Sequence, residues 1–149
     1  MQSYKKYLDY LPVDKIIFIL LQPKFIQMLK QILLVGFGGG IGSIFRFLTS
    51  YFTVKFGIAN YYSTFTVNII GCLLIGFLAG LALKQSLVDT TLRLLLMTGF
   101  CGGFTTFSAF SLENMQMWQA GNYITLTLYI LSSIIFGFAA AGIGLYFTK

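Results

Sequence analysis

The sequence predicts an all-α integral membrane protein with four membrane-spanning helices. Of its 149 residues, 57% are hydrophobic and only 9% are charged, whereas soluble domains carry about a quarter charged residues. Four long segments between residues 31 and 148 hold almost no charge. Each is long enough to cross a hydrocarbon core of about 30 Å at a rise of about 1.5 Å per residue.

The charge-poor segments place the helices near residues 31–53, 62–83, 91–118 and 123–147. Arg46 is the only charged residue of the first segment, and the second is uncharged from Phe56 to Leu83. The short connections leave no room for a soluble module, so residues 31–149 are expected to form one four-helix transmembrane domain. Residues 1–30 hold five lysines, and we expect them to form an amphipathic, interfacial N-terminal extension.

The basic residues are distributed unequally along the chain. Four spans put both termini on one side, together with Lys30, Lys84, Arg93 and Lys149, whereas the opposite side has only Lys55. The positive-inside rule therefore predicts cytoplasmic termini. Because half of the basic residues precede the first apolar segment, their pattern indicates membrane orientation and no nucleic-acid partner. The absence of histidine and of a buried carboxylate pair argues against an enzyme.

Glycines supply the expected packing signal. Small residues at i, i+4 let helix backbones approach closely in lipid, and the sequence has four such pairs: Gly36/Gly40, Gly38/Gly42, Gly76/Gly80 and Gly99/Gly103. With only four helices, we expect some of these faces to meet another subunit. Packing within one chain is the alternative for any single pair.

The third segment contains the run from Gly99 to Ser111, GFCGGFTTFSAFS. Glycine costs a helix about 1 kcal/mol, and the hydroxyl residues compete for backbone hydrogen bonds. We therefore expect this helix to be broken at mid-membrane, although an unbroken helix with glycine packing stays open. The carbonyls that a break exposes are neutral oxygen ligands, which suit a monovalent cation.

Polar and aromatic residues of the later spans suggest a narrow, uncharged route. Phe107 and Phe110 share a helix face at i, i+3, Asn68 stands alone in an apolar span, and Ser132 and Ser133 occupy the middle of the last. Polar groups are expensive in lipid unless they face partners or a pathway. Packing phenylalanines and interhelical hydrogen bonds are the structural alternative.

Two charged residues lie inside the spans, Arg46 and Glu113. Either they pair with each other, or Arg46 concentrates anions at a vestibule, or both side chains simply reach the interface.

Three ordered motifs resemble the Fluc (CrcB) family of fluoride channels over residues 35–147. The most specific is the run Gly99–Ser111 followed by Glu113, which is similar to GFCGG-x-TTFSTFS-x-E. The second is Val67-Asn68-Ile-Ile-Gly71, similar to VN-x-x-G. The third is Gly39-Gly40-Ile-Gly-Ser-Ile-Phe-Arg46, which resembles GG-x-x-GA-x-x-R.

The resemblance implies a dual-topology dimer of antiparallel four-helix subunits in the cell membrane. Its two pores would pass fluoride down its electrochemical gradient and relieve fluoride toxicity. The resemblance implies that Phe107 and Phe110 contact fluoride, that Asn68 donates hydrogen bonds to it, and that Arg46 lies at a vestibule. It also implies that the carbonyls of Gly102 and Thr105 hold a structural Na⁺ at the dimer centre. Further polar residues would line the pore: Ser108, Ser133 and Tyr129.

Departures from the family pattern are modest. Ala109 replaces a threonine between the phenylalanines, and Cys72 stands where serine is common. An antiparallel homodimer also requires insertion in both orientations, which the basic asymmetry disfavours. The partner is therefore either a second copy or an oppositely oriented homologue. From other classes, a small proton-coupled exporter and a purely structural subunit remain as alternatives.

Overall fold

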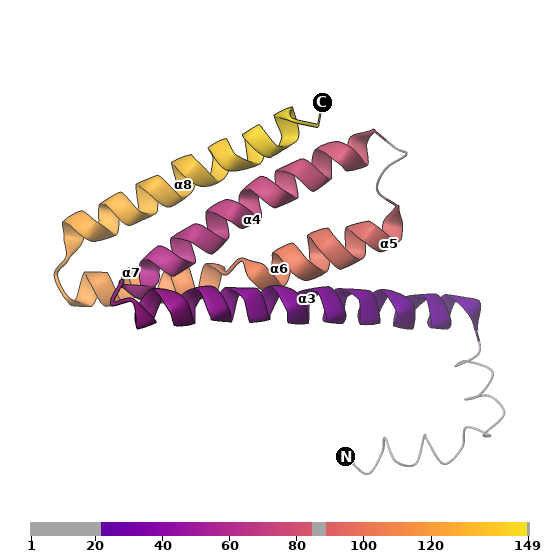
Figure 1. Ribbon diagram of the computed structural model, residues 1–149, viewed down its shortest axis with the longest axis horizontal. Coiled ribbons are helices and arrows are strands. Elements are labelled where there is room, and N and C mark those ends of the chain that lie inside the picture. The colour runs from indigo at the N-terminus through magenta and orange to yellow at the C-terminus, as the bar shows by residue number, and fades with distance from the viewer. Residues whose placement is uncertain (1–21, 85–88, 149) are drawn as a thin grey trace, which may run out of the picture. The chain divides into compact units, whose positions relative to one another are not determined.

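A computed structural model describes residues 22–84 and 89–148, and over these ranges every regular element is a helix (Figure 1). The chain divides into two units, Met1–Leu33 and Leu34–Lys149. Residues 1–21 of the expected extension lie outside the described part. The remainder of that unit is the beginning of helix α3.

The described elements follow in chain order. They are α3 (Pro23–Lys55), α4 (Asn60–Leu83), α5 (Thr90–Leu92), the π-helical η1 (Arg93–Cys101), α6 (Gly102–Phe104), α7 (Phe107–Gln119) and α8 (Tyr123–Tyr146). Four stretches of the described chain are long and apolar enough to span a membrane: Pro23–Lys55, Asn60–Leu83, Thr90–Gln119 and Tyr123–Tyr146. Over the described residues, the prediction of an all-helical chain with four spans is confirmed.

The predicted start of the first helix, near residue 31, is wrong. Helix α3 begins at Pro23, because proline is tolerated at a first helical position and scattered lysines do not end a helix. The predicted start lies where the charged residues end. Charge limits which residues lie in hydrocarbon, but it does not determine where helical hydrogen bonding begins. The starts and ends of the other three spans lie within two residues of their predicted positions.

Helices α4 and α8 run side by side in the same direction (Figure 1). Their contact is made through glycines on both sides. A side chain at Gly76 would collide with the backbone of Ala141, and one at Gly144 would collide with the backbone of Leu73. Gly80 likewise lies against Thr148. Such close approach maximises dispersion contact, which is the main attraction between helices in lipid.

A second glycine contact joins α3, within Leu34–Lys55, to the third span. Gly38 lies against the backbone of Leu95, and Gly42 against that of Phe100. Gly103 faces the backbone of Gly39, and Ser43 Oγ donates to the Gly103 carbonyl at 3.4 Å. By contrast, Gly36 and Gly40 have open space where a Cβ would stand, so only part of the predicted glycine surface is used within the chain.

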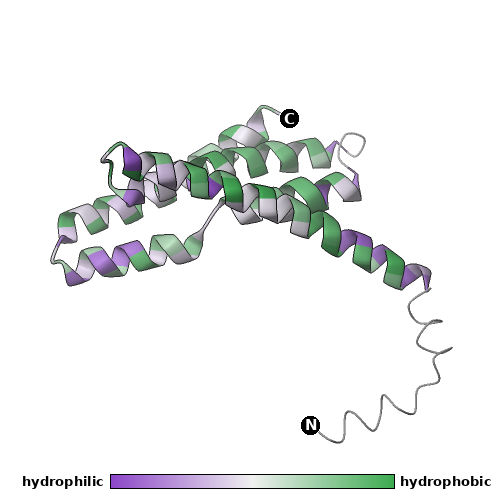
Figure 2. Ribbon diagram, turned by 60° about the horizontal axis from the view of Figure 1, so that its bottom comes forward, coloured by the Kyte–Doolittle hydropathy of each residue, from purple (hydrophilic) through white to green (hydrophobic). Residues whose placement is uncertain are grey.

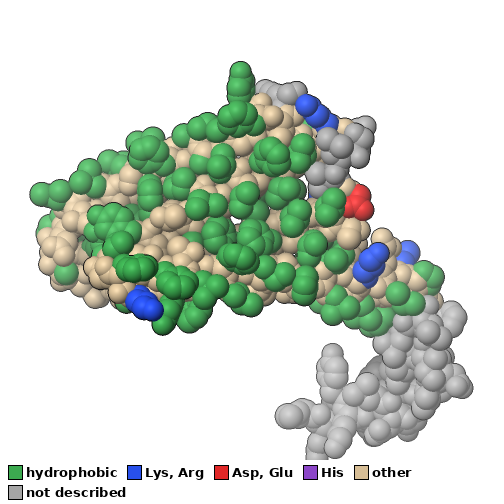
Figure 3. Space-filling model, viewed as in Figure 1, with side chains coloured by type: hydrophobic (Ala, Val, Ile, Leu, Met, Phe, Trp, Pro, Cys, Tyr) green, Lys and Arg blue, Asp and Glu red, His purple; other side chains and the backbone are tan. Residues whose placement is uncertain are grey.

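Apolar side chains cover much of the outer surface of these helices. Ile124 and Phe138 are each 80% exposed. Hydrophobic side chains predominate on the visible face, and the charged ones seen there lie towards its margins (Figure 3). Such a surface fits hydrocarbon, since lipid tails are as apolar as the side chains they contact.

The carboxylate of Glu113 ties α7 to two other helices. This side chain is only 9% exposed. Its Oε1 accepts from Asn60 Nδ2 at 3.1 Å and Thr64 Oγ1 at 2.8 Å, and its Oε2 accepts from the Tyr129 hydroxyl at 2.8 Å. Among the described residues, no ion pair joins Glu113 to Arg46, so three neutral donors stabilise the buried carboxylate instead.

We predict that Gly76→Ala destabilises the protein by about 1–3 kcal/mol, because the new methyl group meets the Ala141 backbone and cannot be accommodated by a side-chain rotation. Thermal unfolding in detergent measures the effect. Gly142→Ala on α8 is the matched control, since its Cβ would enter open space. Equal unfolding temperatures for the two variants would contradict the packing described here.

Glu113→Ala is expected to cost about 1–3 kcal/mol for each donor left without an acceptor. Tyr129→Phe should cost less, because it removes one donor and leaves the carboxylate its bonds from α4. Glu113→Gln keeps a carbonyl oxygen and should fall between wild type and Glu113→Ala. Thermal unfolding of the three variants tests this order, and an unaffected Glu113→Ala protein would refute it.

Candidate functional site

Two residues interrupt the helical conformation of the third span. Thr105 has φ −83° and ψ 160°, and Thr106 has φ −151° and ψ 121°, both extended. The preceding Gly102 and Gly103 keep a helical conformation. The irregularity therefore falls on the hydroxyl residues, whereas Gly99 and Gly103 upstream of it pack against α3.

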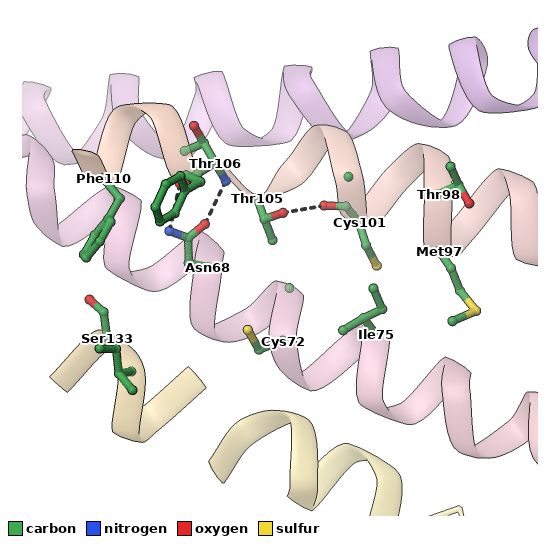
Figure 4. A pocket seen from close by; sticks show the side chains of 14 residues that line it. Asn68, Cys72, Ile75, Met97, Thr98, Cys101, Thr105, Thr106, Phe110 and Ser133 are labelled. Atoms are coloured by element: carbon green, nitrogen blue, oxygen red, sulfur yellow. Dashed lines mark hydrogen bonds between the residues drawn. The ribbon is translucent and has the colours of Figure 1, made fainter. Parts of the chain in front are cut away.

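Asn68 of α4 binds both backbone groups of Thr106. Its Oδ1 accepts from the Thr106 N–H at 2.8 Å, and its Nδ2 donates to the Thr106 carbonyl at 3.1 Å (Figure 4). The Thr106 hydroxyl in turn accepts from the Ala109 N–H at 3.2 Å and caps the start of α7. An extended residue inside an apolar span thus has partners for its backbone.

These hydrogen bonds deprive two carbonyls of their helical donors. In an uninterrupted α-helix the Thr106 N–H would donate to the Gly102 carbonyl, and the Ala109 N–H to the Thr105 carbonyl. Here the first donates to Asn68 and the second to the Thr106 hydroxyl. The oxygens of Gly102 and Thr105 are therefore available as ligands.

A cavity of about 570 Å³ lies beside this segment. It is lined from α4 by Asn68, Gly71, Cys72 and Ile75, from the third span by Met97, Thr98, Cys101, Gly102, Thr105, Thr106, Phe107 and Phe110, and from α8 by Ser133 and Ile134. All of these lining residues are uncharged. Figure 4 shows the Asn68 amide, the Phe110 ring and the Ser133 side chain grouped at one end.

Aromatic edges and one unpaired hydroxyl give this end its chemistry. The rings of Phe107 and Phe110 have centroids 5.9 Å apart and are tilted by 37°. Ser133 Oγ is buried and makes no hydrogen bond with any described residue. Asn68 uses one of its two amide hydrogens on Thr106. The weakly positive ring edges and the stronger N–H and O–H donors therefore line the same uncharged cavity.

The cavity brings together six of the residues that sequence reasoning selected: Asn68, Gly102, Thr105, Phe107, Phe110 and Ser133.

The other three selected residues do not line it. Ser108 is exposed, with its Oγ 3.2 Å from Thr106 Oγ1. Tyr129 is buried and bonds to Glu113, while its ring lies 5.1 Å from that of Phe110. Arg46 is half-buried on α3. The structure thus separates Tyr129, which supports a lining residue, from the lining itself.

Sequence reasoning missed Thr106 and the α4 partners of Glu113. Asn60, Thr64 and Asn68 follow one another at intervals of four and form a polar stripe on one face of α4. That stripe is readable in the sequence. Asn60 and Thr64 bind Glu113, whereas Asn68 binds Thr106. This assignment of partners depends on how α7 packs.

Comparison with known proteins gives a consistent result. The model of the family described as "CrcB-like protein, Camphor Resistance (CrcB)" matches residues 33–145. A protein of Azobacteroides pseudotrichonymphae genomovar. CFP2 named "Fluoride-specific ion channel FluC" is 53% identical over 123 residues, covering 82% of this chain and 98% of the relative.

Two further proteins carry the same name. The one from Flavobacterium psychrophilum is 43% identical over 122 residues, covering 81% of this chain and 98% of the relative. The one from Leptospira interrogans serovar Lai is 45% identical over 117 residues, covering 76% and 92%. With four helices able to span a membrane and a family match over most of its length, this multi-pass membrane protein belongs to the CrcB-like family.

Proposed function

We propose that this chain is a subunit of a fluoride channel that lets fluoride leave the cell passively, down its electrochemical gradient, and so relieves fluoride toxicity. The observation that carries the proposal is the uncharged cavity in which Asn68, Ser133 and two phenyl rings meet. The proposal is also supported by relatives that are named fluoride-specific ion channels. A channel performs no covalent chemistry, so the protein is not proposed to be an enzyme.

Fluoride enters such a route only if the lining replaces its hydration. The free Asn68 N–H and the Ser133 hydroxyl supply hydrogen-bond donors, and phenyl edges present partial positive charge. Conduction also requires that no site holds the ion too tightly. The donors of the lining replace the hydration of fluoride. Because none of them carries a full positive charge, they do not hold the ion too tightly. Ser108 and Tyr129 are proposed to belong to the same polar pathway, and Arg46 to attract anions at its vestibule.

The carbonyls of Gly102 and Thr105 fit a sodium ion. They are neutral oxygens without their helical donors, and hard monovalent cations take such ligands. A bound Na⁺ would supply positive charge that stabilises the interrupted segment. The chain's own contribution is to present these oxygens through the bonds of Asn68 and Thr106.

The exposed surface around the cavity supports an antiparallel, dual-topology dimer. The Phe107 side chain is 79% exposed although it lines the cavity. Gly102, another lining residue, has open space where a Cβ would stand. A partner across this face would enclose the phenylalanine and complete two pores. The partner is a second copy, or an oppositely oriented homologue if the basic asymmetry fixes one insertion.

The proposal is tested by fluoride efflux from liposomes that contain the purified chain alone, with sodium present. A fluoride electrode follows release, and identical chloride-loaded liposomes are the control. We expect rapid efflux of fluoride and none of chloride. Equal chloride efflux would refute selectivity, and silence from folded protein would exclude a homomeric channel. Efflux that requires an imposed proton gradient would favour the exporter, with Glu113 as its carboxylate.

Phe107→Ile and Phe110→Ile should each reduce fluoride efflux at least about tenfold, equivalent to about 1.4 kcal/mol of barrier, because a branched alkyl group lacks a positive ring edge. Both variants should still assemble, as judged by gel filtration. Phe138→Ile, at a highly exposed position of α8, is the matched control. Loss of assembly with unchanged specific efflux would indicate a purely structural role for these rings.

Asn68→Asp should also abolish most fluoride efflux. An aspartate still accepts from the Thr106 N–H, yet it cannot donate to the Thr106 carbonyl and its charge repels an anion. Asn68→Leu should lose both efflux and stability, because Thr106 then lacks both partners. Thr66→Ala, on an exposed position of α4, should behave as wild type. An actively conducting Asn68→Asp protein would disprove the assigned role.

A further inference from the structure

The first turns of α3 exceed what a membrane span requires. Helix α3 has 33 residues, whereas about 20 residues at about 1.5 Å each cross the hydrocarbon core. The family model matches only from residue 33, so Pro23–Ile32 precedes the part of the chain that this model covers.

These first turns have two different faces. At 100° per residue, the polar side chains fall within about one third of the helix circumference: Lys24, Gln27, Lys30 and Gln31. The remaining circumference carries Phe25, Ile26, Met28, Leu29, Ile32 and Leu33. The hydropathy colouring shows both kinds of residue over the first turns of α3 (Figure 2).

Both faces are open in this unit. Ile26, Met28 and Ile32 are each about half exposed, and both lysines are exposed. No acidic residue occurs between positions 22 and 33. An apolar stripe bordered by lysines matches the boundary between acyl chains and anionic headgroups, where lysine stems lie along apolar surface and ammonium groups reach phosphates.

We propose that Pro23–Leu33 is an interfacial anchor that binds the anionic phospholipid surface of the membrane, with its apolar face at the acyl boundary and Lys24 and Lys30 on headgroup phosphates. The charge pattern favours lipid over a second protein chain, since both lysines lie on the polar side and residues 22–33 hold no acidic side chain that could pair with lysines of a second copy. The anchor does not depend on which ion the protein conducts.

Tryptophan quenching in the full-length protein tests the placement. In a Trp118→Phe background, Met28→Trp reports on the apolar face and Gln27→Trp on the polar face. Vesicles of phosphatidylcholine and phosphatidylglycerol carry bromine either near the headgroup or deep in the acyl chains. We expect residue 28 to be quenched at least about twofold more than residue 27 by the shallow bromine, and residue 27 to be the more accessible to aqueous acrylamide.

Three results would overturn the placement. Strong quenching of both positions by the deep bromine means that these turns lie within the span. Absence of quenching at residue 28 means that they stand in water. Quenching at residue 28 that increases when the protein is diluted in excess lipid means that a second copy covers the face.

Lipid charge is tested by the same signal. Omitting phosphatidylglycerol, or introducing Lys24→Gln with Lys30→Gln, should reduce the shallow quenching at residue 28. Lys55→Gln, at the other end of α3, should leave it unchanged. An identical signal in neutral and anionic vesicles would refute recognition of anionic lipid. Fluoride efflux, measured in parallel, reports on the channel proposal separately.

Discussion

The paired hydrogen bonds between the Asn68 amide and the backbone of Thr106 stabilise the extended conformation of Thr106 within the third span. In lipid, an extended residue would otherwise leave its N–H and carbonyl without partners, at a cost of several kcal/mol for each group. The amide supplies both partners at once. Because it does, the carbonyls of Gly102 and Thr105 remain available and the cavity has a polar end.

The other helix contacts of the domain hold Asn68 and Thr106 next to each other. Glycine contacts between α4 and α8 fix the helix that carries Asn68. Glu113 fixes α7 through donors of both those helices. Tyr129 links the two systems, because its hydroxyl binds Glu113 while its ring packs on Phe110. The Glu113 carboxyl group thus joins helices and lies outside the cavity lining.

The positions of the charged residues along the chain also match the surroundings of each segment, either hydrocarbon or the membrane interface. Inside the spans, the one carboxylate is buried among donors. Lysines border the spans, and two of them lie on the polar face of the first turns of α3. This distribution follows from the cost of an unpaired charge in hydrocarbon and the small cost of one at the interface. The same physics underlies the proposed pore and the proposed anchor.

The number of spans, their approximate limits and the family are determined by the sequence itself, because hydropathy and local motifs are properties of consecutive residues. The isolated Asn68 and the paired phenylalanines also mark the site without any coordinates. Other features required the tertiary structure. The backbone is extended at Thr105 and Thr106, and not at the glycines, because Asn68 comes from another helix to bind Thr106. Glu113 likewise takes neutral partners because helix packing decides which donors lie within reach of its buried carboxylate.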